Sequence, residues 1–334
     1  MASNQGKSIF WSLYALFFAV PFPAFIYYAV TYFGGSDSPA LMATNNSYLA
    51  LAYLVVAIIL WLVIIFRMFR AWLIAPATMQ RQRSELQREG TVREAEVVIA
   101  RPIGEKRADG AQQLDVTFRF NNLSGVPIRE KLRVVDIRPA LNRFAVGQHL
   151  RLRVDKTLTK KPVFVLENSE FQVSSTGRFL AFLGWLVLVG VIASFFILSY
   201  QYENRGSGWR FLTFYHPLLI CPLAVMTMRG LFRGTLGRLF GDEQVTIQLK
   251  YRGLRTDARL LEASQTGTSI NDQPEVRFEL EYDDVKGNKH FITHKKIVRL
   301  IDTHITKAKT IPIFYLPEQP ETIGFASDLG GDDE

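Results

Sequence analysis

Histidine is the side chain that most often transfers protons or binds metal near neutral pH, and the chain contains five. His290 and His294 alternate with Phe291 and Thr293, a period-two pattern that predicts a β-strand. Four residues of strand separate two side chains by about 13 Å, which is too far for one metal ion, although the same spacing on a helix would suit one. We therefore expect no metal site at this pair.

His216 lies inside an apolar segment, where an ionisable group is costly and often functional. We favour a structural role, in which the neutral imidazole binds a carbonyl group that Pro217 leaves free. The chain has no glycine-rich phosphate loop, no Gly-x-Ser-x-Gly and no His-Glu-x-x-His motif. The sequence therefore predicts a non-enzymatic protein without a catalytic residue, a cofactor or a metal ion.

The net charge of +8 raises the question of nucleic acid. Basic residues gather in Arg129–Arg133 and Arg151–Arg153, but no aromatic platform for stacking bases accompanies them, so a solvated strand face explains them better. Several other arginines stand at the edges of apolar segments, where membrane proteins place positive charge. We expect no nucleic-acid partner.

Four apolar segments decide the class of protein. Phe179–Leu198 has twenty residues without a charge, which as a helix span about 30 Å, the thickness of a bilayer's hydrocarbon core. The other three are Ser8–Phe33, Tyr48–Phe66 and Phe211–Met228. They predict an α+β membrane protein with four transmembrane helices in two hairpins, each hairpin followed by a polar domain.

Prolines interrupt two of these segments. Pro21 and Pro23 in the first segment, and Pro217 and Pro222 in the fourth, remove backbone donors and should kink the helices. A cleaved signal peptide is the alternative for the first segment. Its charged region would contain only Lys7, however, and no cleavage site stands out.

Arginines predict the orientation of the hairpins. Arg67 and Arg70 follow the second segment, and Arg229, Arg233 and Arg238 follow the fourth, whereas the loops within the hairpins carry few cations. The positive-inside rule then places both termini and both polar domains in the cytoplasm, with these arginines at the membrane interface beside lipid headgroups. We expect a multi-pass protein of the cell inner (cytoplasmic) membrane.

Residues 77–177 change to a period-two pattern, which predicts five short strands. These are Glu94–Ile99, Leu114–Phe120, Ile128–Val134, His149–Val154 and Val163–Leu166. Such closely spaced strands predict a small, partly closed β-barrel of OB or SH3-like type. Before them, residues 78–89 favour a helix that is broken from the preceding span by Pro76 and ended by Gly90.

The second polar domain repeats the first, at offsets of 158 to 163 residues. The pairs that recur include Gly90–Ala95 with Gly253–Ala258, Val116–Phe120 with Val276–Leu280, and Asn121–Gly125 with Asp283–Gly287. Their preserved order, with a hairpin before each copy, indicates an internal duplication and one shared five-stranded fold.

The chain therefore divides into transmembrane hairpin 1 (1–76), cytoplasmic β-domain 1 (77–177), transmembrane hairpin 2 (178–241), cytoplasmic β-domain 2 (242–327) and a disordered acidic tail (328–334). Residues 77–177 have a net charge of +6, whereas residues 242–334 have −5. Opposite charges on related folds predict that the two domains pack together, within one chain or across a dimer, with apolar contact supplying most of the affinity.

Seven positions of the second copy form a recognisable pattern, namely Gly253, Ala258, Phe278, Gly287, Tyr315, Pro317 and Pro320. The pattern resembles a widespread family of bacterial membrane proteins of unknown function, in which transmembrane hairpins tether a small β-barrel domain. The first copy departs from it, with Val154-Asp155 where Tyr315-Leu316-Pro317 would stand. The resemblance implies a membrane-anchored β module, here in tandem, and brings no catalytic residue with it.

Without a catalytic site, we expect an adaptor or an assembly and regulatory scaffold that presents its cytoplasmic β-domains to protein partners or to a second copy of the chain. The alternative is a component of a transporter or channel, in which the proline-broken first and fourth helices line a path. A polar lumen in an oligomer would favour the alternative, and a co-purifying protein would favour the scaffold.

Overall fold

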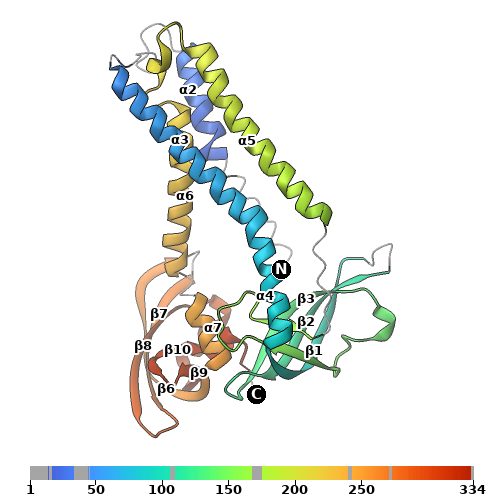
Figure 1. Ribbon diagram of the computed structural model, residues 1–334. Helices are drawn as coiled ribbons and strands as arrows, with labels where there is room; N and C mark the ends of the chain where they lie inside the picture. Colours follow the sequence, from blue (N-terminus) through green and yellow to red (C-terminus); the bar gives the residue numbers. More distant parts are fainter. Residues whose placement is uncertain are drawn as a thin grey trace. The chain divides into compact units, whose positions relative to one another are not determined.

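Among the residues that the structure describes, two helices are long and apolar enough to cross a membrane (Figure 1). The first begins as α3 (Ser47–Phe69), continues through the π-helical turn η2 (Arg70–Ile74) and ends with α4 (Ala75–Glu89), so that 43 residues form one uninterrupted helix. The second is α5 (Ser175–Glu203), with 29 residues. Length and composition thus support two of the four expected spans.

This computed structural model describes residues 14, 17–33, 44, 46–105, 110–167, 175–239, 243–270 and 273–331. They fall into a helical unit, from residues 1–80 and 171–240, and a β unit, from residues 81–170 and 241–334. Both β copies therefore belong to one unit, even though the second hairpin separates them in the sequence.

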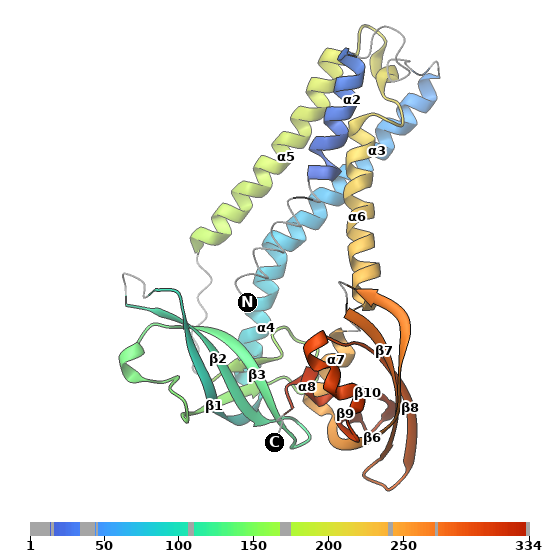
Figure 2. The same ribbon diagram turned by 180° about the vertical axis from the view of Figure 1, so that it is seen from behind.

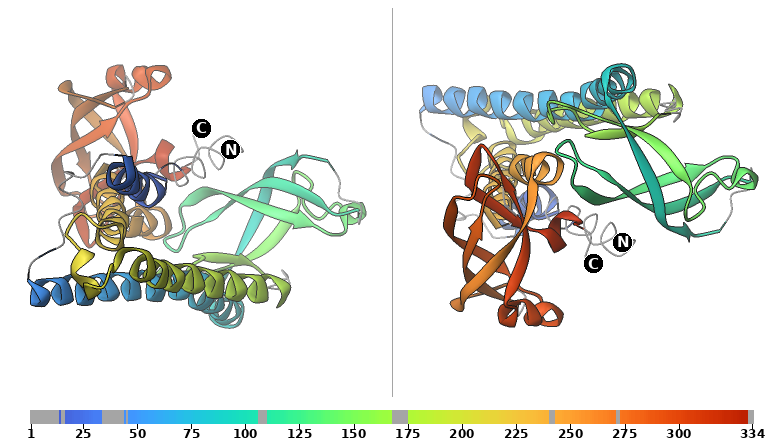
Figure 3. Two further views of the ribbon diagram at one scale, coloured as in Figure 1. Left: turned by 90° about the horizontal axis from the view of Figure 1, so that it is seen from above. Right: turned by 90° about the horizontal axis from the view of Figure 1, so that it is seen from below.

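The other two expected spans are shorter in the described residues. α2 (Pro21–Phe33) has 13 residues, and the apolar part of α6 (Pro217–Leu239) ends at Met228. The described residues therefore contain two long apolar helices rather than four. Both short helices begin at a proline, whose fixed φ angle and missing N–H suit the first position of a helix. Part of the first expected segment lies outside the described residues. Within the helical unit α3 contacts α5 and α6, and α2 contacts α6 (Figure 3).

The helix does not break at Pro76, which corrects the expectation from the sequence. A proline lacks an N–H group, and its ring crowds the carbonyl four residues back, which is that of Trp72. The η2 turn widens the helix at this point, and the N–H of Ala75 bonds to the carbonyl of Arg70, five residues earlier. The helix therefore continues past Pro76 and ends before Gly90, as expected.

Each β copy is a curled, five-stranded antiparallel sheet (Figure 2). The first contains β1 (Thr91–Ile103), β2 (Gln112–Asn121), β3 (Pro127–Asp136), β4 (His149–Val154) and β5 (Phe164–Leu166), in the order β3-β2-β1-β4-β5. The second contains β6 (Leu254–Ile270), β7 (Gln273–Asp283), β8 (Lys289–Ile297), β9 (Thr310–Leu316) and β10 (Gln319–Phe325), in the order β10-β9-β6-β7-β8. The two orders agree when one is read backwards, so the prediction of one shared fold is confirmed.

Smaller features of the two sheets repeat as well. β1 has a bulge after Val97, and β6 has one after Leu260, 163 residues later. A short 3-10 helix joins the third and fourth strands of both copies, as η3 (Pro139–Leu141) and η5 (Leu300–Lys307). A bulge redirects a strand and is a deliberate feature of a fold, so its recurrence at one position supports an internal duplication.

The hairpin loops after β2 and β7 also share their hydrogen bonds. Asn122 and Asp284 each accept, through one side-chain oxygen, the N–H groups of the second and fourth residues after them. This equivalence aligns Val116 with Phe278, and not with Val276 as the sequence pattern indicates. A shift of two residues keeps every side chain on the same face of a strand, so a period-two pattern cannot detect it.

Gly90 and Gly253 occupy equivalent corners, where a helix passes into the first strand of each copy. The second corner follows α7 (Glu243–Arg252). Both glycine N–H groups bond at 2.8 Å to a carbonyl four residues earlier, that of Leu86 or Leu249. A Cβ atom would lie 2.5 Å from that oxygen at Gly90 and 2.1 Å from it at Gly253, so only glycine fits either corner.

Candidate functional site

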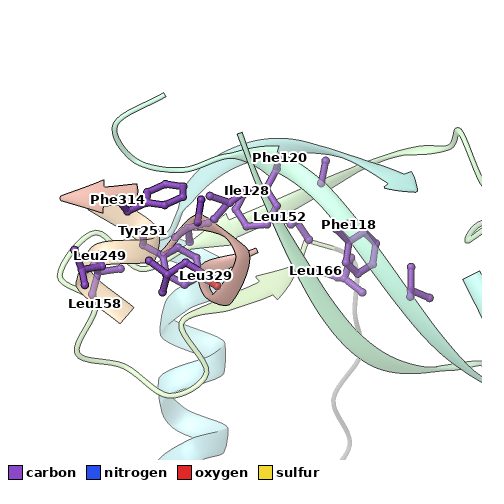
Figure 4. Close-up of a cluster of buried hydrophobic side chains, with 14 of the residues drawn as sticks. Phe118, Phe120, Ile128, Leu152, Leu158, Leu166, Leu249, Tyr251, Phe314 and Leu329 are labelled. Atoms are coloured by element: carbon purple, nitrogen blue, oxygen red, sulfur yellow. The ribbon is translucent and has the colours of Figure 1, made fainter. Parts of the chain in front are cut away.

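The interior of the first β copy continues into a layer of side chains from the second copy, and together they form one cluster of buried residues, here called the shared core (Figure 4). From the first copy it contains, among others, Phe118, Phe120, Ile128, Leu152 and Leu166. From the second it contains Leu249 and Tyr251 of α7, Phe314 of β9, and Leu329. The predicted packing of the two copies is therefore confirmed, and it occurs within one chain through apolar contact.

β9 differs from its counterpart β4 in having two apolar faces. β4 reads His-Leu-Arg-Leu-Arg-Val, whereas β9 reads Thr-Ile-Pro-Ile-Phe-Tyr-Leu. Ile313 and Tyr315 belong to the core of the second copy alone, and Phe314 between them belongs to the shared core. The residue equivalent to Phe314 is Arg153, whose guanidinium pairs with Glu167 at 2.6 Å. Burial of both strand faces explains the continuous apolar run in β9.

The hairpin loop of the first copy caps the C-terminal end of α7 in the second. The donors are Nδ2 of Asn122, the N–H of Leu123 and the hydroxyl of Ser124, and the acceptors are the carbonyls of residues 250–253, at 2.6 to 3.0 Å. The last carbonyls of a helix have no partner within it. Here the other copy supplies those partners, so the helix end is complete only when the two copies are joined.

Glu130 on β3 adds polar contacts to this interface. Its carboxylate accepts the hydroxyl of Tyr251 at 2.8 Å and pairs with the ammonium of Lys250 at 2.9 Å. Burial, together with the nearby Glu130 carboxylate, raises the pKa of Tyr251 well above its usual value. A second pair joins Lys161 to Glu243 at 2.8 Å. Because the two pairs have opposite polarity, the difference in net charge between the copies does not by itself determine the contact.

The expected disordered tail (328–334) is only partly a tail, which corrects the domain boundary. The short helix α8 (Ala326–Leu329) follows β10, and Leu329 is 4% exposed in the shared core. The carbonyl of Gly330 accepts the N–H of Arg129 at 2.6 Å, and Gly331 forms an isolated β-bridge with Ile128. One leucine among acidic residues and glycines gives no periodic signal, so sequence reasoning missed this contact. Residues 332–334 lie outside the described part of the chain.

A separate polar cluster lies in the helical unit, around Glu203 at the end of α5. Its carboxylate accepts the hydroxyls of Tyr27 at 3.3 Å and Tyr28 at 3.1 Å, and Nε2 of His216 lies 3.2 Å from both carboxylate oxygens. Nδ1 of His216 accepts the N–H of Leu218 at 3.1 Å. Because Nδ1 is an acceptor, Nε2 carries a hydrogen and donates a hydrogen bond to the carboxylate of Glu203.

His216 is thus the N-terminal cap of α6. The sequence-based expectation that its ring binds a carbonyl freed by Pro217 is therefore wrong. Pro217 is the first residue of the helix, where a missing N–H costs nothing. Three further hydroxyl groups are buried without a hydrogen-bond partner in the described structure, those of Thr31, Ser199 and Thr213. Each stands three or four positions along the chain from a residue of the cluster. Buried polar groups of this kind usually bind water, so the cluster is suited to hold water and to pass a proton.

Pro222 lies inside α6, as expected, and leaves the carbonyl of Leu218 without its intrahelical partner. The indole Nε1 of Trp61 on α3 donates to this carbonyl at 3.0 Å, in buried surroundings. The bond that proline removes within one helix is therefore replaced by a bond between two helices. Trp61 itself is 7% exposed, packed with Ile64, Ile192 and Cys221.

Replacement of Trp61 by phenylalanine should destabilise the helical unit by about 1–3 kcal/mol, because a buried carbonyl loses its donor. In the Pro222→Ala background the alanine N–H can bond to Leu218, so the same replacement should cost clearly less. Thermal unfolding of the four proteins in detergent, treated as a double-mutant cycle, measures the coupling. Equal costs in both backgrounds would contradict this role of Trp61.

The other proline and arginine positions are placed as follows. Pro21 and Pro23 occupy the first turn of α2, after a turn at Val20 that separates them from helical residues 17–19. Arg67 and Arg70 are exposed at the end of α3. The backbone at the remaining three interface arginines, Arg229, Arg233 and Arg238, continues α6, and their side chains lie outside the described part.

The paired histidines lie on β8, which confirms the predicted strand. Nε2 of His290 bonds to Asp284 at 3.1 Å, and the ring of His294 lies 5.3 Å from that of Phe325. Among the described residues, no group of three or more His, Cys, Asp or Glu side chains could hold a metal ion.

Burial lowers the pKa of His294, with the nearby Asp328 opposing this effect and Lys296 adding to it. The folded state therefore favours the neutral ring, whereas the unfolded chain takes up a proton near the ordinary value of about 6.5. The free energy of unfolding should fall as the pH drops below that value. Urea unfolding at several pH values should show a flatter profile for His294→Gln than for wild type. His149→Gln, at an exposed site, should keep the wild-type slope; identical slopes for all three would refute the assignment.

Comparison with known proteins does not assign the chain to a family. No protein family model matches the sequence, and no curated protein matches it. Among solved structures, a deletion mutant of the single-stranded DNA binding protein from Thermus aquaticus is similar at 11% identity, over 70% of this chain and 84% of that one, with a TM-score of 0.14. So low a score carries no argument about fold or function.

Proposed function

We propose that the chain is a non-enzymatic adaptor or assembly scaffold of the cell inner (cytoplasmic) membrane, whose two β copies act as one cytoplasmic module. The shared core carries this proposal. Because Phe314 and Leu329 of the second copy are buried in the shared core, the two copies present a single combined surface to a partner. Two domains that were tethered separately would present two independent surfaces. The β module is thus a rigid platform held at the membrane.

The membrane location rests on the two long apolar helices. In this proposal α2 and α6 complete two hairpins of four spans, and the positive-inside rule places the β module on the cytoplasmic side with Arg67 and Arg70. Lipids surround the helical unit, and protein partners or a second copy of the chain bind the β module. Neither nucleic acid nor a metal ion takes part.

Cysteine accessibility tests the location. The natural Cys221 is fully buried, so a single introduced cysteine reports on its own site. In intact cells, Ser207→Cys between α5 and α6 should react with an impermeant thiol reagent. Val285→Cys, at a position 71% exposed in the second β copy, should react only after the cells are opened. Reaction of Val285→Cys in intact cells would reject the proposed orientation.

Affinity purification from native membranes tests the scaffold. A protein partner should remain with the wild type at a fixed ratio. Charged replacements of exposed apolar side chains on the module, such as Phe291→Asp, should leave folding intact and reduce retention if that side chain contacts the partner. A chain that retains no protein under any extraction condition would not be a scaffold.

A component of a transporter or channel is the second candidate, and the polar cluster around Glu203 and His216 favours it. A carboxylate and an imidazole in contact, with unpaired buried hydroxyls nearby, can relay protons. Proton flux into proteoliposomes that Glu203→Gln abolishes would support this candidate. Absence of proton flux in wild-type proteoliposomes would reject this candidate and leave the scaffold as the proposed function.

A further inference from the structure

One face of α3 forms a shallow apolar groove that ends in two arginines. It is lined by Ile59, Leu62, Val63, Phe66, Arg67 and Arg70. Ile59, Leu62 and Phe66 are each more than half exposed, at 54%, 57% and 58%. The opposite face of the helix buries Trp61 and Ile64 against the rest of the helical unit. All six residues come from α3 and the first position of η2, so in the described part of the chain one continuous helix lines this groove.

The two arginines at the end of the groove are free to bind a ligand. Neither Arg67 nor Arg70 has a hydrogen bond or an ion pair from its side chain in the described structure. Three residues along a helix place two side chains on the same face, about one turn apart. Two planar guanidinium groups in that arrangement can share one phosphate group through paired N–H donors.

The dimensions of α3 match those of a bilayer. The rise from Tyr48, which is 85% exposed at the start of the helix, to Arg67 is about 28 Å, close to the whole hydrocarbon core. The rise from Ile59 to Arg70 is about 16 Å, close to one leaflet. The arginines therefore reach the depth of the headgroups, and the apolar part of the groove lies beside the acyl chains of a single leaflet.

We propose that this groove binds one anionic phospholipid. Arg67 and Arg70 hold its phosphate, and an acyl chain lies along Ile59, Leu62 and Phe66. The net negative charge of the lipid complements two cations that have no counter-charge among the residues that the structure describes, whereas the ammonium group of a zwitterionic lipid would oppose them. This inference rests on the proposed membrane location, and it adds a defined ligand and its contacts to the general positive charge of the membrane interface.

Native mass spectrometry of the full chain, released from nanodiscs containing equal amounts of phosphatidylglycerol and phosphatidylcholine, tests the proposal. The wild type should retain one phosphatidylglycerol in preference to phosphatidylcholine. The double variant Arg67→Gln/Arg70→Gln should weaken that preference by roughly 30-fold, as expected for the loss of two cations near an anionic lipid. Leu62→Trp, which fills the groove without changing its charge, should reduce retention of both lipids.

The matched control is Arg88→Gln/Arg101→Gln, which removes the same charge from exposed positions outside the groove. It should retain phosphatidylglycerol as the wild type does. Equal losses in the two double variants, or a wild type without lipid preference, would overturn the proposal. A chain extracted from cells without detergent would instead refute the membrane location, so the two failures can be told apart.

Discussion

Replacement of Phe314 by alanine is expected to lower the free energy of unfolding of the β unit by about 3–5 kcal/mol, the usual cost of removing a buried phenylalanine. Phe314 is 0% exposed and lies in the shared core, so its loss leaves a cavity where the two copies meet. Pulse proteolysis of the full chain in detergent, across a series of urea concentrations, measures the change.

Phe291→Ala is the matched control, because Phe291 stands in the same sheet but is 70% exposed. It should change the free energy of unfolding by less than about 0.5 kcal/mol. If the two replacements had similar effects, Phe314 would not be part of a continuous core, and the two β copies would have to be regarded as independently stable.

Replacement of Asn122 by aspartate is expected to destabilise the β unit by about 2–4 kcal/mol. Asn122 is 1% exposed, and its Nδ2 donates at 3.0 Å to two carbonyls at the end of α7. A carboxylate of the same shape cannot donate, and the negative end of the helix repels it. Urea unfolding should show the loss of stability, and amide exchange should show faster opening of α7.

The duplication provides the control for this variant. Asp284 occupies the equivalent position, where its side chain bonds within its own loop and to His290. Asp284→Asn keeps the oxygen that accepts the two loop N–H groups and changes only the contacts of the other oxygen with Asn288 and His290, so it should have a smaller effect than Asn122→Asp. Comparable losses would mean that the cap on α7 contributes little and that the loop conformation alone matters.

Local patterns predict the elements of this fold well. Alternation over six or seven residues predicts the first four strands of the first copy, because a half-buried strand must alternate, whereas the fifth strand is predicted from only four residues, Val163–Leu166. The expected break at Pro76 is wrong. Proline disrupts a regular α-helix, but here a π-helical turn precedes Pro76 and lets the helix continue. The difference in net charge between the two β copies predicts that they are in contact, but it does not predict the apolar residues that hold them together. The apolar run in β9 does indicate the cause, because a strand that is apolar on both faces needs cover on both.

The polar cluster could not have been predicted from the sequence. Tyr27 and Glu203 are 176 residues apart, and no motif relates them. His216 alone marks the place, and its partners become evident only when α2, α5 and α6 are brought together. The capping of α7 by Asn122 also joins distant residues, 128 and 131 positions apart. The aligned loops do reveal one signal, because the asparagine of the first copy can donate a side-chain hydrogen bond and the aspartate of the second cannot.

The discontinuity of the β unit has a consequence for biosynthesis. Ile128 in β3 is among the first core residues to leave the ribosome, but its neighbours Leu329 and Gly331 are made some two hundred residues later, after the second hairpin. The nascent first copy must therefore remain incomplete, with apolar surface uncovered, while α5 and α6 are being made. The order of translation thereby makes the closure of the β module its last step, after both helices of the second hairpin and residue 331 have been made.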